Sequence, residues 1–213
     1  MADVLAPFTT VHAPTAMVAS ADQLASQAGI LVLRRGGNAV DAAIATNAVL
    51  AVTGPHMCGM GGDLFALVHH GSGAPAALNA SGRAGSGADP DRLRAAGHTV
   101  MPFRESVHAI PVPGCVDGWV TLHQRFGRLP LADALEPAIA YADDGFPASP
   151  LLVGLLPRLD GLDLPDEWRE IHRTARHAGA LVRRPGVGRA LRAVARDGRT
   201  GFYGGEFGAG LLA

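Results

Sequence analysis

Apolar residues near the start of the chain recur at helical spacing. Between residues 24 and 31 they fall on one face, which predicts a helix in this region. Ser20 and Gln23 have the spacing of a capping box at the start of that helix. Immediately before it, residues 17–20 are expected to form a short strand.

Gly36 and Gly37 separate this helix from a second one, because glycine tolerates the backbone conformation that ends a helix. Asn38 is a suitable cap for the second helix, and Asp41 falls in its first turn. Apolar residues of the run AAIATNAVLAV occur all round this helix, so we predict that it is buried. It is expected to end at Thr53, where a Gly-Pro pair follows.

A glycine-rich stretch, GPHMCGMGGD at residues 54–63, comes next. Two apolar runs, LFALVHH and PAALNAS, follow it and are separated by the sequence GSG at residues 71–73. Two strand-like runs joined by a short glycine-containing turn predict a β-hairpin.

The second half of the chain is predicted to be mainly helical. Asp89 and Pro90 open a short helix, and residues 107–112 are expected to form another strand. Longer helices are predicted at Val116–Phe126, Leu131–Tyr141, Pro150–Leu159, Pro165–Ala175 and Gly188–Asp197. So few strands cannot close a two-sided sheet, and the sequence stops in the apolar run GEFGAGLLA. We therefore expect the chain to be part of a longer polypeptide or of a complex.

Composition narrows the classes of function. Of 213 residues 48% are hydrophobic and 17% charged, which is typical of a globular protein, and the net charge of -1 favours neither nucleic acid nor an anionic membrane surface. No apolar run reaches membrane-spanning length, and the N-terminus lacks the pattern of a secretory signal, so a cytoplasmic protein is expected. Cys58 and Cys115 allow at most one disulfide.

A metal site is the main alternative chemistry that the residues suggest. Its candidate ligands are His56, Cys58, Asp63, His69 and His70. No pair among them has a zinc spacing such as C-x-x-C or H-E-x-x-H, and adjacent histidines on a strand point to opposite faces. We therefore expect neither a metal nor another cofactor.

Several sequence motifs, in consistent order, resemble the N-terminal part of the γ-glutamyltransferase family, which includes related acylases and amidohydrolases. They are MVASADQLASQAGILVLRRGGNAVDAAIATNAVLAV, GPHMCGMGGDLFALV, LNASGRA, IPVPGCVDGW, FGRLPLADALEPAIAYADDGF and LRAVARDGRTGFYGGE. The resemblance implies an α/β fold, the four-layer αββα sandwich of N-terminal-nucleophile hydrolases, of which this chain is the incomplete large-subunit part. Residues 1–16 would be a leader, and residues 17–213 would belong to the large subunit.

The resemblance also implies a reaction. A proenzyme of this family cleaves itself into a large and a small subunit, and the new N-terminal Thr of the small subunit attacks a γ-glutamyl amide such as glutathione. Its α-amino group is the adjacent base, and the acyl group then passes to water or to an amino acid or peptide. Nothing in this chain corresponds to that nucleophile, so we expect no catalytic residue here. Thr9 and Thr10 resemble the Thr-Thr pair at which proenzymes of the family cleave themselves, but only superficially, and we interpret them as part of the leader.

Arg83 is the substrate-binding residue that the resemblance implies, because the arginine at this place in the family binds the α-carboxylate of the glutamyl group. A guanidinium can hold a carboxylate through two parallel hydrogen bonds. Relatives commonly have Pro two residues later, whereas this chain has Gly85, which leaves the amide substrate open. An acylase or amidohydrolase of the same family, or a non-catalytic scaffold, are the alternatives.

Two loops are expected to support that site. Gly59, Gly61 and Gly62 match neither usual phosphate-binding template, since no Lys-Ser/Thr pair follows them and the G-x-G-x-x-G spacing is absent. In the family this loop packs near the active centre, so a supporting role is expected. Pro113 and Gly114 belong to a second loop that lies close to the substrate cleft in the family, and they are expected to act as scaffold.

Asp117 follows in the next predicted helix. There it is expected to be a first-turn carboxylate that interacts favourably with the helix dipole, and not a catalytic acid.

Overall fold

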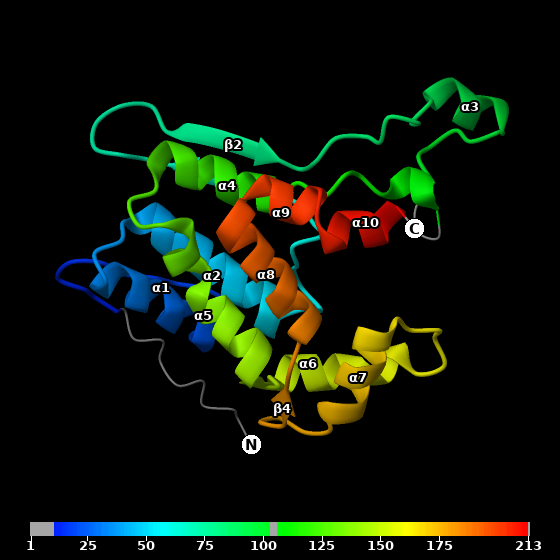
Figure 1. Cartoon of the computed structure of the whole chain (residues 1–213). Coiled ribbons are helices and arrows are strands. Elements are labelled where there is room, and N and C mark those ends of the chain that lie inside the picture. Colours follow the sequence, from blue (N-terminus) through cyan, green and yellow to red (C-terminus); the bar gives the residue numbers. More distant parts are fainter. Residues whose placement is uncertain (1–10, 103–105, 213) are drawn as a thin grey trace, which may run out of the picture.

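The computed structural model describes residues 11–102 and 106–212, and helices dominate it (Figure 1). α1 (Gln23–Arg34) and α2 (Ala39–Thr53) form a helical hairpin, and α4 (Cys115–Phe126) and α5 (Leu131–Asp144) pack against α2. α8 (Pro185–Asp197) packs on α5 in turn.

Helix α2 lies at the centre of this arrangement. Eleven of its 15 residues are buried, which confirms that it is covered all round. Asn38 is its N-cap, and its side chain and that of Asp41 form a reciprocal capping box, also as predicted. Small residues such as Ala45 and Ala48 let neighbouring helices approach closely.

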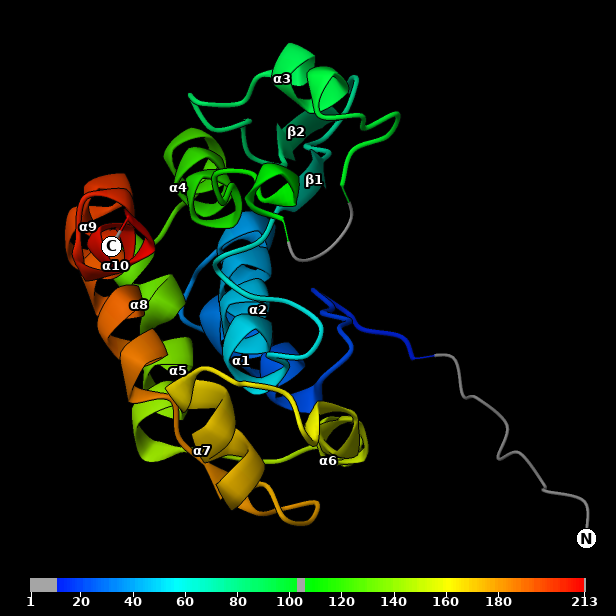
Figure 2. The ribbon, with the colours of Figure 1, turned by 90° about the vertical axis from the view of Figure 1, so that its right-hand side faces the viewer.

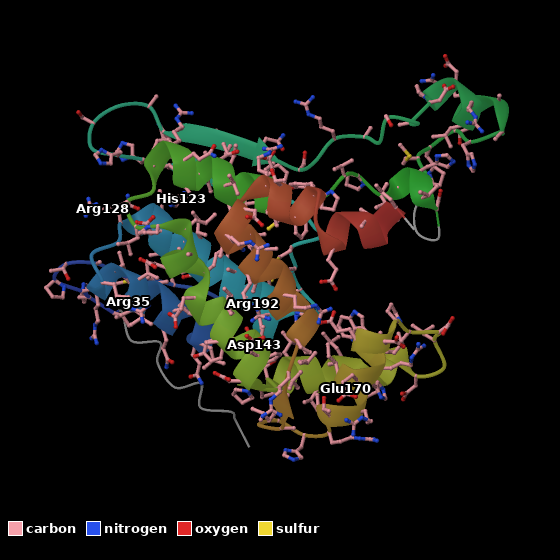
Figure 3. All side chains as sticks on the ribbon, in the orientation of Figure 1. Arg35, His123, Arg128, Asp143, Glu170 and Arg192 are labelled. Carbon is pink, nitrogen blue, oxygen red and sulfur yellow. The ribbon has the colours of Figure 1, made fainter. Side chains whose placement is uncertain are left out.

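Ion pairs tie the outer helices to this core, and Figure 3 labels several of their members. Arg192 of α8 pairs with Asp143 of α5, and Arg35 at the end of α1 pairs with Glu136 of α5, with a closest N–O distance of 2.8 Å in the second pair. Both pairs are partly exposed, so packing of the apolar faces contributes most of the stability of these contacts.

The predicted hairpin is confirmed. β1 (Leu64–Val68) and β2 (Ala76–Ala80) are antiparallel, with Leu64 opposite Ala80 and Val68 opposite Ala76. One face of the hairpin packs on α4, where a Cβ on Gly118 would approach Leu64 Cδ2 to 2.9 Å. The other face is open: Phe65 is 64% and Leu67 is 79% exposed. Figure 2 shows the hairpin and α3 (Pro90–Ala95) at one end of the protein and α6 (Pro150–Leu155) and α7 (Asp166–Thr174) at the other.

The remaining elements are short. They are η1 (Val107–Ala109), β3 (Phe146–Pro147), α6 (Pro150–Leu155), η2 (Leu156–Leu159), α7 (Asp166–Thr174), β4 (Leu181–Val182), α9 (Arg199–Tyr203) and α10 (Glu206–Leu212). β3 and β4 pair with each other as a second, antiparallel sheet of two residues per strand.

Two predicted strands are wrong. Residues 17–20 have no ladder partner within the described part of the chain, and a strand needs one. Residues 107–112 contain a single 3-10 turn, Val107–Ala109, because the Ser106 hydroxyl accepts a hydrogen bond from the N–H of His108 (3.3 Å) and favours a turn.

The start of the first helix also differs from the prediction. Its N-cap is Asp22, whose carboxylate accepts from Leu24 N–H (2.7 Å), while the Ser20 hydroxyl donates to the Asp22 carbonyl (2.7 Å). Asp22 takes the role because its side chain reaches the second free amide of the helix. The later predicted helices are confirmed, although the one from Leu131 continues to Asp144 and the one that ends at Asp197 begins already at Pro185. The helix predicted over residues 150–159 tightens to a 3-10 helix after Leu155.

The structure contains both helices and strands, in agreement with the predicted α/β class, and within residues 11–102 and 106–212 the strands form only the two small sheets. None of the helices in this part of the chain is long and apolar enough to cross a membrane. The cytoplasmic location and the boundary between residues 16 and 17 stay predictions, and Thr9 and Thr10 lie outside the described residues.

Candidate functional site

Three loops meet at the end of the β1–β2 hairpin through backbone hydrogen bonds. Val112 N–H donates to the Arg83 carbonyl (2.9 Å), and the N–H groups of Gly114 and Cys115 both donate to the Gly62 carbonyl (3.0 Å each). The structure therefore brings Gly62, Arg83 and Gly114, three of the residues singled out in the sequence, into one place. We call this place the loop junction, made of residues 59–63, 81–83 and 111–115.

Close backbone contact explains two glycines of the loop junction. Gly82 has φ +88°, which favours glycine, and a Cβ there would lie 1.9 Å from the Val112 carbonyl oxygen. A Cβ on Gly114 would lie 2.0 Å from the carbonyl oxygen of Ala80. Main chain thus packs directly on main chain, which holds the backbone of Arg83 in a defined position.

The Arg83 side chain is exposed, although its backbone is anchored. Within residues 11–102 and 106–212 its guanidinium has no ion-pair or hydrogen-bond partner, whereas Arg184 pairs with Glu167 and Arg199 pairs with Asp117. A permanent cation on an anchored backbone, flanked by small residues, can receive a carboxylate from solution through two parallel hydrogen bonds. The carboxylate-binding role itself stays a prediction.

Tyr203 holds the loop junction from the side of α9, and the sequence analysis missed it. Its hydroxyl donates to the Pro113 carbonyl (2.7 Å) and accepts from Asp117 N–H (3.1 Å). Burial raises the pKa of Tyr203, so the hydroxyl stays a donor at neutral pH. Asp117 lies in the first turn of α4, as predicted, and its carboxylate pairs with Arg199. The link spans more than 80 residues, so no local pattern could have revealed it.

Gly59 and Gly61, the other two glycines singled out in the glycine-rich stretch at residues 54–63, have a different environment from Gly62. Gly59 and Gly61 line a cavity of about 550 Å³ bordered by α7, α8 and α10, and Gly62 does not. Arg184 also lines this cavity, but it is buried, pairs with Glu167 (2.9 Å) and donates to two carbonyls at the end of α2. Its charge is therefore already compensated, and this arrangement stabilises the fold.

The candidate metal ligands do not assemble into a cluster. Within the residues that the structure describes, no group of three or more His, Cys, Asp or Glu side chains is placed to hold a metal ion. His69 and His70 are exposed just after β1, and burial lowers the pKa of His56 and so favours its neutral form.

Cys58 and Cys115 are both free thiols, and the buried Cys115 is expected to react more slowly than the half-buried Cys58. Burial, with smaller contributions from Cys58 and Asp63, raises the pKa of Cys115 to about 12, and burial also raises the pKa of Cys58. Because the thiolate is the reactive form, Cys115 of the native protein should resist iodoacetamide at pH 8, while both thiols should react in urea. Mass spectrometry of the alkylated peptides measures this. Fast native labelling of Cys115 would contradict the buried position.

Similarity to known proteins extends over most of the chain. The family described as Gamma-glutamyltranspeptidase matches residues 25–213. The glutathione hydrolase-like YwrD proenzyme of Bacillus subtilis (strain 168) is 49% identical over 134 residues, which are 62% of this chain and 25% of that protein. The oxamate amidohydrolase proenzyme of Klebsiella pneumoniae is 37% identical over 198 residues, which are 89% of this chain and 37% of that protein.

A solved structure agrees with these matches. The gamma-glutamyltranspeptidase of Helicobacter pylori superimposes with a TM-score of 0.83 at 27% identity, covering 96% of this chain and 60% of that one. The chain thus spans less than two thirds of each of these relatives, and its α/β fold is a part of the N-terminal-nucleophile hydrolase fold. With a family match over residues 25–213, this chain belongs to the gamma-glutamyltranspeptidase family and covers its N-terminal, large-subunit part.

Proposed function

We propose that this chain is the large-subunit part of an enzyme that cleaves γ-glutamyl amides such as glutathione, and that Arg83 binds the α-carboxylate of the glutamyl group. The observation that carries the proposal is the exposed guanidinium of Arg83 on the loop junction, with no ion-pair or hydrogen-bond partner among residues 11–102 and 106–212. A fork of two N–H groups matches the geometry of a carboxylate, and the anchored backbone limits the entropy lost on binding.

The nucleophile belongs to a partner in this proposal. A Thr hydroxyl of a small subunit attacks the amide carbonyl, and its own α-amino group takes the hydroxyl proton. The protonated α-amino group then gives this proton to the amide nitrogen, the C–N bond breaks, and the amine is released. Water or an amino acid or peptide then accepts the glutamyl group from the acyl-enzyme. Arg83 orients the substrate for this attack, Gly59, Gly61, Gly62, Pro113 and Gly114 support it, and no cofactor takes part.

A second candidate is an amidohydrolase for another small carboxylate. It is favoured by the 37% identity with the oxamate amidohydrolase proenzyme over 89% of this chain. Gly85, at the place where the family commonly has Pro, makes the turn after Arg83 less constrained and leaves room for a different acyl group. Arg83 would have the same task in both candidates, because both substrates present a carboxylate.

The test is to express this chain together with its downstream coding sequence and to measure release from a γ-glutamyl anilide and from oxamate. Arg83→Ala is expected to lower kcat/KM for the preferred substrate about 100-fold, mainly through KM, because a charge-assisted pair is lost. Arg83→Lys should recover only part of this, since a point charge replaces the planar fork.

Arg158→Ala is the matched control, because Arg158 is an exposed arginine of η2, distant in sequence from the loop junction, and its removal should leave KM unchanged. An unchanged KM in Arg83→Ala would remove Arg83 from the site. Absence of any activity in the reconstituted wild-type protein would instead favour a non-catalytic scaffold.

A further inference from the structure

We propose that Tyr203 is a positioning residue for Arg83, acting through the loop at residues 111–114. The inference rests on the proposed function, since it assigns to Tyr203 the task of holding the arginine that binds the substrate carboxylate. Tyr203 itself touches neither the substrate nor the reacting atoms in this proposal.

The first step is the position of the Tyr203 hydroxyl. Helix α4 begins after Gly114, which has no side chain to cap the free amides of the first turn. The Tyr203 hydroxyl accepts from one of these amides, Asp117 N–H, and donates to the carbonyl of Pro113, the residue before Gly114. A single group thus holds both sides of the turn that leads into α4.

The second step runs from this turn to Arg83. Val112, next to Pro113, donates its N–H to the Arg83 carbonyl (2.9 Å), and Gly114 donates to the Gly62 carbonyl (3.0 Å). Gly82 packs directly on the Val112 carbonyl, as the position of its absent Cβ shows. Because these contacts join main chain to main chain, a displacement of residues 111–114 also displaces Arg83.

The third step is that the Tyr203 ring is itself fixed. It packs edge to face on Phe202, with centroids 5.1 Å apart, and Phe202 is fully buried and stacks on Phe207 at 4.1 Å. Arg199 lies 5.9 Å from the Tyr203 ring centre and pairs with Asp117, which links α9 to α4 a second time. α9 and α4 lie side by side in Figure 1.

The kinetic test uses the complete protein, this chain with its downstream sequence, and a γ-glutamyl anilide. Tyr203→Phe removes only the hydroxyl and is expected to raise KM about fivefold to tenfold, with kcat changed less than about twofold. Tyr141→Phe is the matched control, because the half-buried Tyr141 hydroxyl has no hydrogen-bond partner within the described residues, and KM should stay unchanged.

A double-mutant cycle separates positioning from general stability. If Tyr203 acts through Arg83, adding Tyr203→Phe to Arg83→Ala raises KM no further, and Tyr203→Phe has no effect on a 4-aminobutyryl anilide, which lacks the α-carboxylate. Additive effects of the two substitutions would overturn the inference alone. An unchanged KM in Arg83→Ala would instead overturn the proposed function.

Amide hydrogen exchange tests the same inference without any activity. In Tyr203→Phe the Val112 and Gly114 amides should exchange at least about tenfold faster, while the amide of Val49 in buried α2 should change little. Uniform acceleration of all amides, or unchanged exchange at Val112 and Gly114, would contradict a positioning role. Tyr141→Phe should show the wild-type pattern.

Discussion

Asp41→Ala is expected to lower the free energy of unfolding by about 4 kcal/mol, a large part of the stability of an ordinary domain. Asp41 is fully buried in α2, where a carboxylate persists only if hydrogen bonds replace its lost hydration. Its Oδ2 accepts from Asn38 N–H (2.9 Å) and from Leu129 N–H (3.3 Å). Arg128 N–H reaches both oxygens, at 3.0 and 3.1 Å.

The expected loss of stability is large because the Asp41 carboxylate accepts hydrogen bonds from two different turns. Asn38 belongs to the turn between α1 and α2, and Arg128 and Leu129 belong to the turn between α4 and α5. Figure 3 labels Arg128 near this second turn. Truncation would remove the acceptor of three partly buried main-chain amides, and a donor left unpaired away from solvent costs more than the hydrogen bond itself contributes.

Urea unfolding followed by circular dichroism measures the effect as a lower midpoint at an unchanged slope. Asp91→Ala is the matched control: Asp91 is 87% exposed in α3, and its ion pair with Arg94 should contribute nothing measurable. Equal midpoints for the two variants would show that the Asp41 network does not hold the turns.

Most helices were predictable because their signals are local. The apolar surroundings of α2, the Asn38 cap and the glycines at 36 and 37 act within a few residues, and the structure confirms each of them. The strand predicted at residues 17–20 failed for the opposite reason, since a strand depends on a partner that the local pattern does not specify. The two-residue strands β3 and β4 are too short to leave any periodic pattern.

The residues of the candidate site also differ in how far the sequence could predict them. Arg83 was found through the family resemblance of the surrounding motifs, and no periodicity or spacing would have selected it. The meeting of Gly62, Arg83 and Gly114 depends on hydrogen bonds between loops far apart in the chain, and Tyr203 joins them from a still more distant helix. Such contacts are properties of the folded chain and not of any short segment.

Gly114→Ala is expected to have the largest effect on the candidate site. The φ of Gly114 is -100°, which alanine adopts without strain, so the effect comes from space alone. A Cβ would lie 2.0 Å from the Ala80 carbonyl oxygen and 2.6 Å from the Gly82 nitrogen. The two segments must therefore separate by more than an ångström, which breaks the hydrogen bonds to Gly62 and releases Arg83.

We expect this substitution to lower the free energy of unfolding by about 3 kcal/mol. In the reconstituted enzyme kcat/KM should fall about 100-fold or more, at least as far as in Arg83→Ala, because a misplaced binding group loses its effect. Gly154→Ala is the control: apart from the neighbouring backbone of its own helix, no atom lies within 4 Å of the added Cβ, and alanine should stabilise α6 slightly. Wild-type kinetics in Gly114→Ala would mean that the backbone contact between residues 80–82 and 114 does not position the arginine.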